Sequence, residues 1–224
     1  MKKRKSAIII LYSLLMFALL VSCDLISGPD EVVEDVEIEE EGLARNGSYI
    51  NEASELLAIG ELELALSYFE QAIHDGQELP LAWRGVGMIR FMQNEFGEAR
   101  VALETALALG GESTAIIYNM LGVASMRTLD FEQAIDYFDT GIVWFHLSLE
   151  RAGGSLTEMI YGSPTEQQIE GLSLDVLQSM MQNRILSHQN LGNWEEAREL
   201  ARAYLLVFPD DAMIQREYEF LQTR

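Results

Sequence analysis

The sequence predicts an all-α fold in which helical hairpins stack on one another to form a solenoid. Four anchor alanines recur along the chain: Ala65, Ala99, Ala134 and Ala197. The first three are spaced by about 34 residues, which is the length of one helix–turn–helix unit, and the last spacing is nearly twice as long. Large and small side chains also return at fixed spacings around each anchor, which indicates that the units pack in the same way.

Four copies of one pattern align on these alanines. They are Tyr49, Ala53, Ala65, Phe69, Ala72; then Trp83, Gly87, Ala99, Leu103, Ala106; then Tyr118, Gly122, Ala134, Phe138, Gly141; and finally Met181, Ile185, Ala197, Ala201, Tyr204. Helices whose axes cross about 8–10 Å apart have room only for small side chains at the contact. We therefore expect Gly87 opposite Ala99 and Gly122 opposite Ala134, with the large residues filling the space toward the next unit.

This pattern resembles the tetratricopeptide repeat (TPR), whose aromatic, glycine, alanine and proline positions fall at the same offsets. The resemblance extends over about residues 45–209 with one interruption, and it is strongest in the second and third copies. It implies a TPR-like helical-hairpin solenoid of about four repeats, with an insertion before the last repeat and a C-terminal capping helix. An ordinary helical bundle with coincidental spacings is the alternative.

The individual helices follow from the periodicity and from start and stop signals. The predicted segments are 48–59, 62–73, 80–94, 96–109, 113–128, 130–152, 163–190, 194–207 and 209–223. Glycine is favoured just past a helix end, and Gly60, Gly110 and Gly153 occupy such places. The last helix, with Arg216, Glu217 and Glu219 on a charged face, would cap the solenoid.

An insertion at about 142–177 departs from the family pattern, because no proline closes the third repeat. We expect the helix before it to run on to Ala152, followed by a loop at 154–162. The next helix would begin at a capping box, Ser163–Glu166, and bend at Gly171. The insertion is about 28 residues longer than a normal repeat, and it leaves open whether the fourth repeat stacks regularly.

The N-terminal residues 1–22 are predicted to be a lipoprotein signal peptide. Four basic residues precede an apolar run from Ala7 to Val21, as in secretory signals. The following Leu20–Cys23 resembles the lipobox of bacterial lipoproteins, which implies cleavage before Cys23 and acylation of its thiol. An uncleaved anchor helix is the alternative, but the apolar run is shorter than the ~20 residues that a spanning helix needs. Cys23 is the only cysteine, so no internal disulfide can form.

Residues 23–46 are predicted to be the lipidated cysteine and an acidic, disordered tether, before a TPR-like domain at 47–224. Eight of the twelve residues 30–41 are acidic, and like charges extend a segment that has few apolar residues. A binding tail for a basic partner is the alternative interpretation. The expected location is the bacterial cell envelope, lipid-anchored and facing the periplasm or the cell exterior, with inner and outer membrane both open.

Charge excludes one class of partner. The full chain has 15 basic and 36 acidic residues, and the four basic residues before Cys23 would be lost with the signal. The remaining 11 against 36 give the mature chain a formal charge of −25, and all 11 are arginines. Binding a phosphate backbone requires a positive surface, so we expect no nucleic-acid partner.

The sequence predicts no enzyme, because no catalytic, cofactor-binding or metal-binding pattern is present. The three histidines, His74, His146 and His188, fall on different predicted helices, without acidic or cysteine neighbours at metal-ligand spacing. Phosphate loops, dinucleotide fingerprints and nucleophile elbows are missing from the sequence. The many carboxylates are spread along the helix exteriors.

Two segments are candidates for binding. The TPR resemblance implies a peptide groove on the inner face of the first helices, and its positions include Ile50, Ser54, Leu81 and Ile116. The other groove positions are the predicted partner-binding residues, Arg84, Met88, Phe91, Met92, Asn119, Val123, Met126 and Arg127. The family's clamp for chaperone tails is absent. Methionine suits adaptable contacts, although each methionine could equally be filling the core. The second candidate is the inserted loop with Met159, Ile160 and Tyr161, whose alternative is a packing lid.

These observations predict a membrane-anchored extracytoplasmic scaffold or adaptor that binds a protein or peptide partner in an envelope assembly. The alternative is a carrier of an apolar, lipid-like ligand, or an accessory subunit of a solute transporter.

Overall fold

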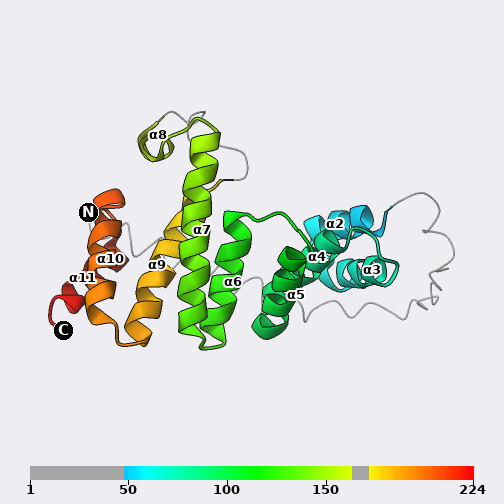
Figure 1. Ribbon diagram of the computed structural model, residues 1–224, viewed down its shortest axis with the longest axis horizontal. Coiled ribbons are helices and arrows are strands. Elements are labelled where there is room, and N and C mark those ends of the chain that lie inside the picture. The colour runs from blue at the N-terminus through cyan, green and yellow to red at the C-terminus, as the bar shows by residue number, and fades with distance from the viewer. Residues whose placement is uncertain (1–47, 163–171) are drawn as a thin grey trace, which may run out of the picture. The chain divides into compact units, whose positions relative to one another are not determined.

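The computed structural model describes residues 48–162 and 172–224 (Figure 1). The predicted signal peptide, the acylated Cys23, the acidic tether and the capping box at Ser163–Glu166 lie outside the described residues.

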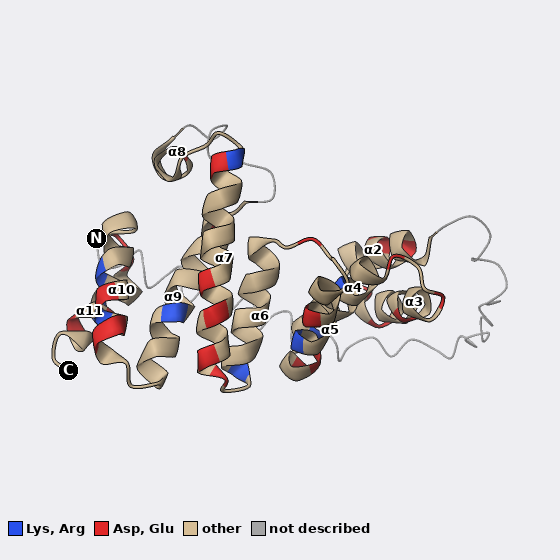
Figure 2. Ribbon diagram, viewed as in Figure 1, with Lys and Arg blue, Asp and Glu red and all other residues tan. Residues whose placement is uncertain are grey.

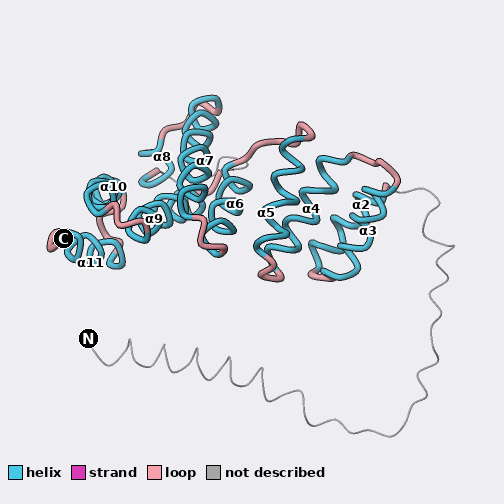
Figure 3. Tube along the Cα trace, turned by 60° about the horizontal axis from the view of Figure 1, so that its bottom comes forward, coloured by secondary structure: helices cyan, strands magenta, loops and turns pink. Residues whose placement is uncertain are grey.

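The described residues form helices joined by short turns and loops, with no strand among them (Figure 3). The helices are α2 (Tyr49–Ile59), α3 (Leu62–His74), α4 (Leu79–Met92), α5 (Phe96–Ala108), α6 (Ala115–Arg127), α7 (Phe131–Arg151), α8 (Leu156–Tyr161), α9 (Leu174–Asn190), α10 (Trp194–Val207) and α11 (Ala212–Leu221). Four hairpins result, namely α2–α3, α4–α5, α6–α7 and α9–α10, and neighbouring hairpins pack on one another. In this part of the chain, no helix has the length and apolarity that crossing a bilayer demands.

Each hairpin turns through one residue in the left-handed backbone region. These residues are Gly60, Asn94, Leu129 and Gly192, with φ of 86°, 63°, 65° and 78°. Glycine and asparagine tolerate this conformation, whereas the Cβ of other residues is strained there. Leu129 is therefore unusual, and its side chain is also 75% exposed.

Small residues allow close helix contacts, as predicted, and the atoms nearest to each glycine belong to the large residue one turn beyond the anchor alanine. A Cβ on Gly87 would lie 2.6 Å from Leu103 Cγ and 3.1 Å from the Leu103 backbone nitrogen. A Cβ on Gly122 would likewise meet the ring of Phe138. The glycines therefore face the large residue one turn beyond the anchor alanine, because a side chain of the second helix fills the space that the glycine leaves.

The buried side chains form two main clusters and a small one between them. The first joins α2 to α5 around Phe69 and Ile89, and the second joins α6 to α11 around Phe138, Phe145 and Tyr204. The small cluster contains only three buried residues, Leu103, Ile117 and Leu121, which connect α5 with α6.

The inserted segment differs from the prediction in two respects. The predicted loop 154–162 contains the short helix α8, which begins at a capping box formed by Ser155 and Glu158. The predicted helix 163–190 is not continuous, because Leu172 and Ser173 are not helical and α9 begins after Ser173. The long helix α7 was predicted correctly and ends with Ala152 as its cap.

The fourth hairpin stacks on the third as the second stacks on the first. Helix α9 packs on both α7 and α6, as α4 packs on both α3 and α2. Helix α11 packs on α10, with Arg216 and Glu219 exposed. The insertion therefore lengthens the connection between two hairpins without changing how they pack.

Candidate functional site

A pocket of about 220 Å³ lies between the first helices of the first two hairpins. Its lining residues are Ile50, Ser54, Leu57, Phe69, Leu81, Arg84, Gly85 and Met88. Five of them belong to the groove that the sequence predicted: Ile50, Ser54, Leu81, Arg84 and Met88. The backbone of α4 comes close to the Phe69 ring because Gly85 has no side chain, and a Cβ there would overlap the ring.

Arg84 is the only charged residue among those that line this pocket. Its nearest acidic partner in the described part of the chain is Glu112, with 4.0 Å between Nη1 and Oε2. Because the Glu112 side chain is 72% exposed, water screens the pair and its contribution is small. The guanidinium can therefore exchange this partner for a carboxylate or carbonyl of a ligand at little cost.

Three predicted groove residues lie instead near the turns of the second and third hairpins. The Phe91 and Phe96 rings meet edge to face at 5.4 Å, and the guanidinium of Arg127 lies 5.0 Å from the Phe96 centroid. Met92, next to Phe91, is 54% exposed. Phe96 was missed by the groove prediction, although an aromatic residue three positions before each of Ala99, Ala134 and Ala197 was a visible signal.

The last three predicted groove residues are partly covered by the fourth hairpin. The hydroxyl of Ser179 on α9 donates to Asn119 Oδ1 at 3.2 Å. Val123 and Met126 are half-buried against the cluster that includes α7 and α9. The eight predicted partner-binding residues therefore lie in three places: the pocket, the hairpin turns and the contact with α9. Only Arg84 and Met88 line the pocket.

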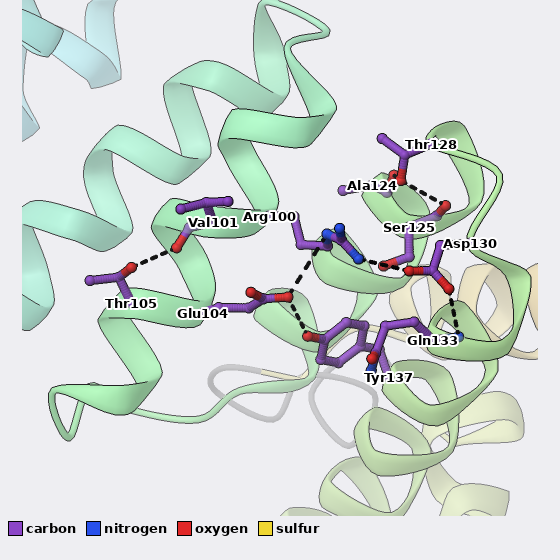
Figure 4. A network of polar contacts seen from close by, with 10 residues as sticks. All are labelled: Arg100, Val101, Glu104, Thr105, Ala124, Ser125, Thr128, Asp130, Gln133 and Tyr137. Carbon is purple, nitrogen blue, oxygen red and sulfur yellow. Dashed lines mark hydrogen bonds and ion pairs between the residues drawn. The ribbon is translucent and has the colours of Figure 1, made fainter.

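A polar network connects the second and third hairpins (Figure 4). Arg100 Nη1 donates to Asp130 Oδ2 at 2.9 Å, and the Tyr137 hydroxyl donates to Glu104 Oε1 at 2.7 Å. Burial, followed by the hydrogen bond to Glu104, raises the pKa of Tyr137. Every charged member has an opposite charge or a donor nearby, so the network has a structural role.

A second network holds the last three helices together. The Tyr204 hydroxyl donates to Asp211 Oδ2 at 2.6 Å, and Gln182 Nε2 donates to the same oxygen at 2.7 Å. Asp211 Oδ1 accepts the backbone N–H of Met213 and Ile214 and so caps α11. Burial would raise the pKa of Asp211, but the bond from Tyr204 and the other donors together lower it. Burial and the bond to Asp211 raise the pKa of Tyr204 to about 12.

Charged residues are spread over the helix exteriors, as Figure 2 shows. The three histidines lie on α3, α7 and α9. Within residues 48–162 and 172–224, no group of three histidine, cysteine, aspartate or glutamate side chains is placed to hold a metal ion. Arg84 and the apolar wall of the pocket on α2 and α4 suit recognition of a ligand rather than bond-making chemistry.

None of the curated proteins compared with the chain matches it. Among solved structures, YrrB, described as a TPR protein with an unusual peptide-binding site, is 19% identical, with a TM-score of 0.44 over 76% of this chain and 90% of that chain. The C-terminal part of a TPR protein from Cytophaga hutchinsonii is 13% identical, with a TM-score of 0.42 over 74% of this chain and 67% of that one. A tetratricopeptide repeat protein from Parabacteroides merdae is 14% identical, with a TM-score of 0.41 over 77% and 70%.

The family described as tetratricopeptide repeat matches residues 50–110 and residues 93–143. The helices at these positions alternate as the repeat requires, so the predicted TPR-like fold is confirmed. Residues 50–143 of this chain are tetratricopeptide repeats.

Proposed function

We propose that this chain is a membrane-anchored, extracytoplasmic scaffold that binds a segment of a protein partner at the inner face of its first helices. Repeats of this kind generally serve as non-enzymatic scaffolds, and their fold implies a protein or peptide partner. The sequence of residues 1–23 supports the anchor and the envelope location, and the pocket between α2 and α4 supports the binding surface.

The pocket is the observation that supports the proposal most directly. Residues that are far apart in sequence, from Ile50 to Met88, form its apolar wall, and Arg84 supplies one charge. An apolar side chain of the partner would enter the pocket while Arg84 pairs with a neighbouring carboxylate or carbonyl. Arg127, Phe91 and Met92 would contact the same segment further along, near the hairpin turns.

The size of the pocket favours a peptide side chain over a lipid-like ligand. Pockets that enclose small molecules usually measure about 300–1,000 Å³. The volume of about 220 Å³ between α2 and α4 is smaller than that range. A carrier function would require a larger enclosed space at the groove. Native mass spectrometry tests this alternative, because lipid that co-purifies with the protein would favour the carrier.

Site-specific photocrosslinking in the native cells tests the groove. A photoreactive amino acid replaces Met88 in the pocket, and a matched variant carries it at Leu64, an exposed apolar residue of α3 outside the pocket. We expect one discrete crosslinked protein from position 88 and none from position 64. Equal yields from both positions, or crosslinking only to lipid, would contradict the proposal.

The anchor is tested separately. Globomycin, which blocks the lipoprotein signal peptidase, should cause the precursor to accumulate, and Cys23→Ala, which removes the acylation site, should likewise leave the precursor uncleaved. The intact mass of the wild-type protein should correspond to a chain that begins at an acylated Cys23. A wild-type protein that keeps residues 1–22 and carries no acyl group would support the uncleaved anchor helix instead.

A further inference from the structure

A second pocket lies where the inserted helix α8 comes beside the connection between α10 and α11. Its volume is about 350 Å³, and it is lined by Ile160, Tyr161, Gln178, Val207, Phe208, Pro209, Asp210 and Asp211. Two of these residues come from the insertion and five from the segment 207–211. The pocket therefore exists only because of the inserted segment, and it uses none of the residues that line the pocket between α2 and α4.

The pocket has two aromatic residues, of which Phe208 is almost fully buried and Tyr161 is largely exposed. Helix α8 is fixed by Met159, which is buried in the main cluster, and by its capping box. Tyr161 projects from this fixed helix and is 70% exposed, whereas Phe208 is 9% exposed and packs against Tyr204. Among the residues that the structure describes, the Tyr161 side chain therefore remains largely exposed at the rim of the pocket.

The charges of the pocket all have one sign. Among the described residues that line it, two are acidic and none is basic. Asp211 is committed to the hydrogen bonds from Tyr204, Gln182 and the start of α11. Asp210 is exposed, and it takes part in none of the ion pairs found in residues 48–162 and 172–224. The carboxylate of Asp210 is therefore available to a ligand.

We propose that this pocket binds a basic side chain, an arginine or a lysine, presented by a protein partner. The cation would lie against the ring of Tyr161 and pair with Asp210, while its methylene groups contact Ile160, Val207 and Pro209. A cation over an aromatic face gains electrostatic energy that a neutral group does not. Arginine fits best, because a planar guanidinium stacks on the ring and pairs with a carboxylate at the same time.

Two features select a protein side chain over a free small cation. The open rim at Tyr161 leaves a small cation in contact with water on one side, so its affinity would be low. A partner surface covers that rim and removes the water, which strengthens the same contacts. The formal charge of −21 on the whole chain also attracts a basic partner and accelerates its association.

The test is an NMR titration of the full-length protein, purified in a neutral detergent, with two probes. N-acetyl-arginine amide carries the guanidinium, and N-acetyl-citrulline amide is its uncharged equivalent. We expect the arginine probe to shift backbone amide signals of residues 158–161 and 207–211 with millimolar affinity, and the citrulline probe to bind at least threefold more weakly. Equal binding of the two probes, or shifts confined to other helices, would overturn the proposal.

Variants locate the binding and separate it from folding. Tyr161→Leu and Asp210→Asn should each weaken the arginine probe by about two- to fivefold, the range expected for an exposed cation–aromatic contact. Tyr161→Phe, which keeps the ring, and Asp175→Asn, at an exposed acid on α9, should leave the affinity unchanged. Unchanged binding in both Tyr161→Leu and Asp210→Asn would exclude this site.

A third probe distinguishes the source of the cation. Tetramethylammonium carries a positive charge without a side chain, and we expect it to bind more weakly than the arginine probe. If it binds at least tenfold more tightly, the pocket is a site for a free cation and the proposal of a partner side chain is wrong. The groove proposal is unaffected by either result, because Met88 and Arg84 take no part in this experiment.

Discussion

The hairpins α2–α5 and the helices α6–α11 are held together in different ways. In the first region Phe69 packs on Gly85 and Leu103 packs on Gly87, and the ion pairs between its helices, from Arg90 to Glu70 and Glu98, involve partly exposed side chains. In the second region, hydrogen bonds cross between helices as well, from Gln182 on α9 and Tyr204 on α10 to Asp211. Both regions use close glycine contacts, with Gly122 against Phe138 as the example in the second region, and the second region adds hydrogen bonds to Asp211 from the buried Tyr204 and from Gln182.

The junction between the two regions, where α5 packs on α6, has a small buried apolar core and two polar links between side chains. Its buried core consists of Leu103, Ile117 and Leu121, and Arg100 and Tyr137 add polar links across it. Partly buried side chains, among them Leu107, Met120 and Tyr137, pack around this small core.

The largest effect is expected at the glycine contacts. Gly87→Ala should destabilise the protein by about 2–3 kcal/mol, because overpacking of a close contact costs about 1–3 kcal/mol and the Leu103 backbone nitrogen cannot move aside easily. Urea denaturation measures the change. The matched control is Gly97→Ala on α5, where a new Cβ would meet no atom within 4 Å. Its stability should rise by about 0.5–1 kcal/mol, and a similar loss in both variants would contradict the crossing.

Loss of the hydrogen bond from Tyr204 to Asp211 in the second region should reduce the free energy of unfolding somewhat less. Tyr204→Phe removes the donor to Asp211 but keeps the buried ring, and hydrogen bonds to charged groups contribute about 1.5–3 kcal/mol. We expect a loss near the lower end of that range, because Gln182 still donates to Asp211. Thermal melting followed by circular dichroism measures it, and an unchanged melting temperature would show that the bond contributes nothing.

The same hydroxyl makes stability depend on alkaline pH. The pKa of Tyr204 rises from its ordinary value of 10.0 to about 12 on folding, so its stabilisation is complete below pH 10 and is lost as the pH rises toward 12. The pKa of Tyr137 is raised as well. Wild-type stability should therefore fall between pH 10 and 12, and it should fall less in Tyr204→Phe. A pH profile of equal slope in both proteins would contradict this assignment.

The junction should show a smaller coupling. A double-mutant cycle of Arg100→Met and Asp130→Asn should give an interaction energy of about 0.5–1 kcal/mol, because both side chains are partly exposed. The coupling should decrease between 0.05 and 0.5 M salt, as expected for roughly 10 Å screening at 0.1 M. Coupling that is independent of salt would show that the pair is linked by packing rather than by charge.

The smallest effect is expected at the strained turn, where Leu129 has a positive φ. Leu129→Gly relieves a left-handed conformation that costs a non-glycine residue about 1 kcal/mol or more. The greater freedom of glycine in the unfolded chain offsets about 0.5–1 kcal/mol of this gain. The net result in urea denaturation should therefore be a small gain in stability. Gly60→Ala, at the equivalent turn of the first hairpin, should lose stability, and a gain there would contradict the explanation.

The sequence was sufficient for most helix limits, because glycines and alanines mark where helices end and cross. It failed at the predicted loop 154–162, which contains the short helix α8. The capping box formed by Ser155 and Glu158 was the signal that could have predicted this helix. Which side chain fills the space above Gly87 could not be read from spacing either, since Ala99 and Leu103 both face the first helix.

The repeat period made part of the candidate site predictable. Ile50, Arg84 and Met88 share one pocket because their places on α2 and α4 follow from the repeat period. The environment of Asn119 could not be predicted, because it depends on how α9 returns after an insertion of irregular length. Family offsets place residues on a helix face, but they do not reveal which neighbour covers that face.

The length of α7 determines in what order the chain opens. Its 21 residues extend about 30 Å, against about 20 Å for the 13 residues of α6, so one helix belongs to the third hairpin and to the insertion at once. In a stack of short units, either terminal unit can detach by itself. Here the hairpin α2–α3 can detach from α4, whereas α9 packs on α7, and Phe145 and Leu149 of α7 share one buried cluster with Leu177 and Met180 of α9. Amide hydrogens from α6 to α10 should consequently exchange as a single slow group, while protection in α2 and α3 decreases independently.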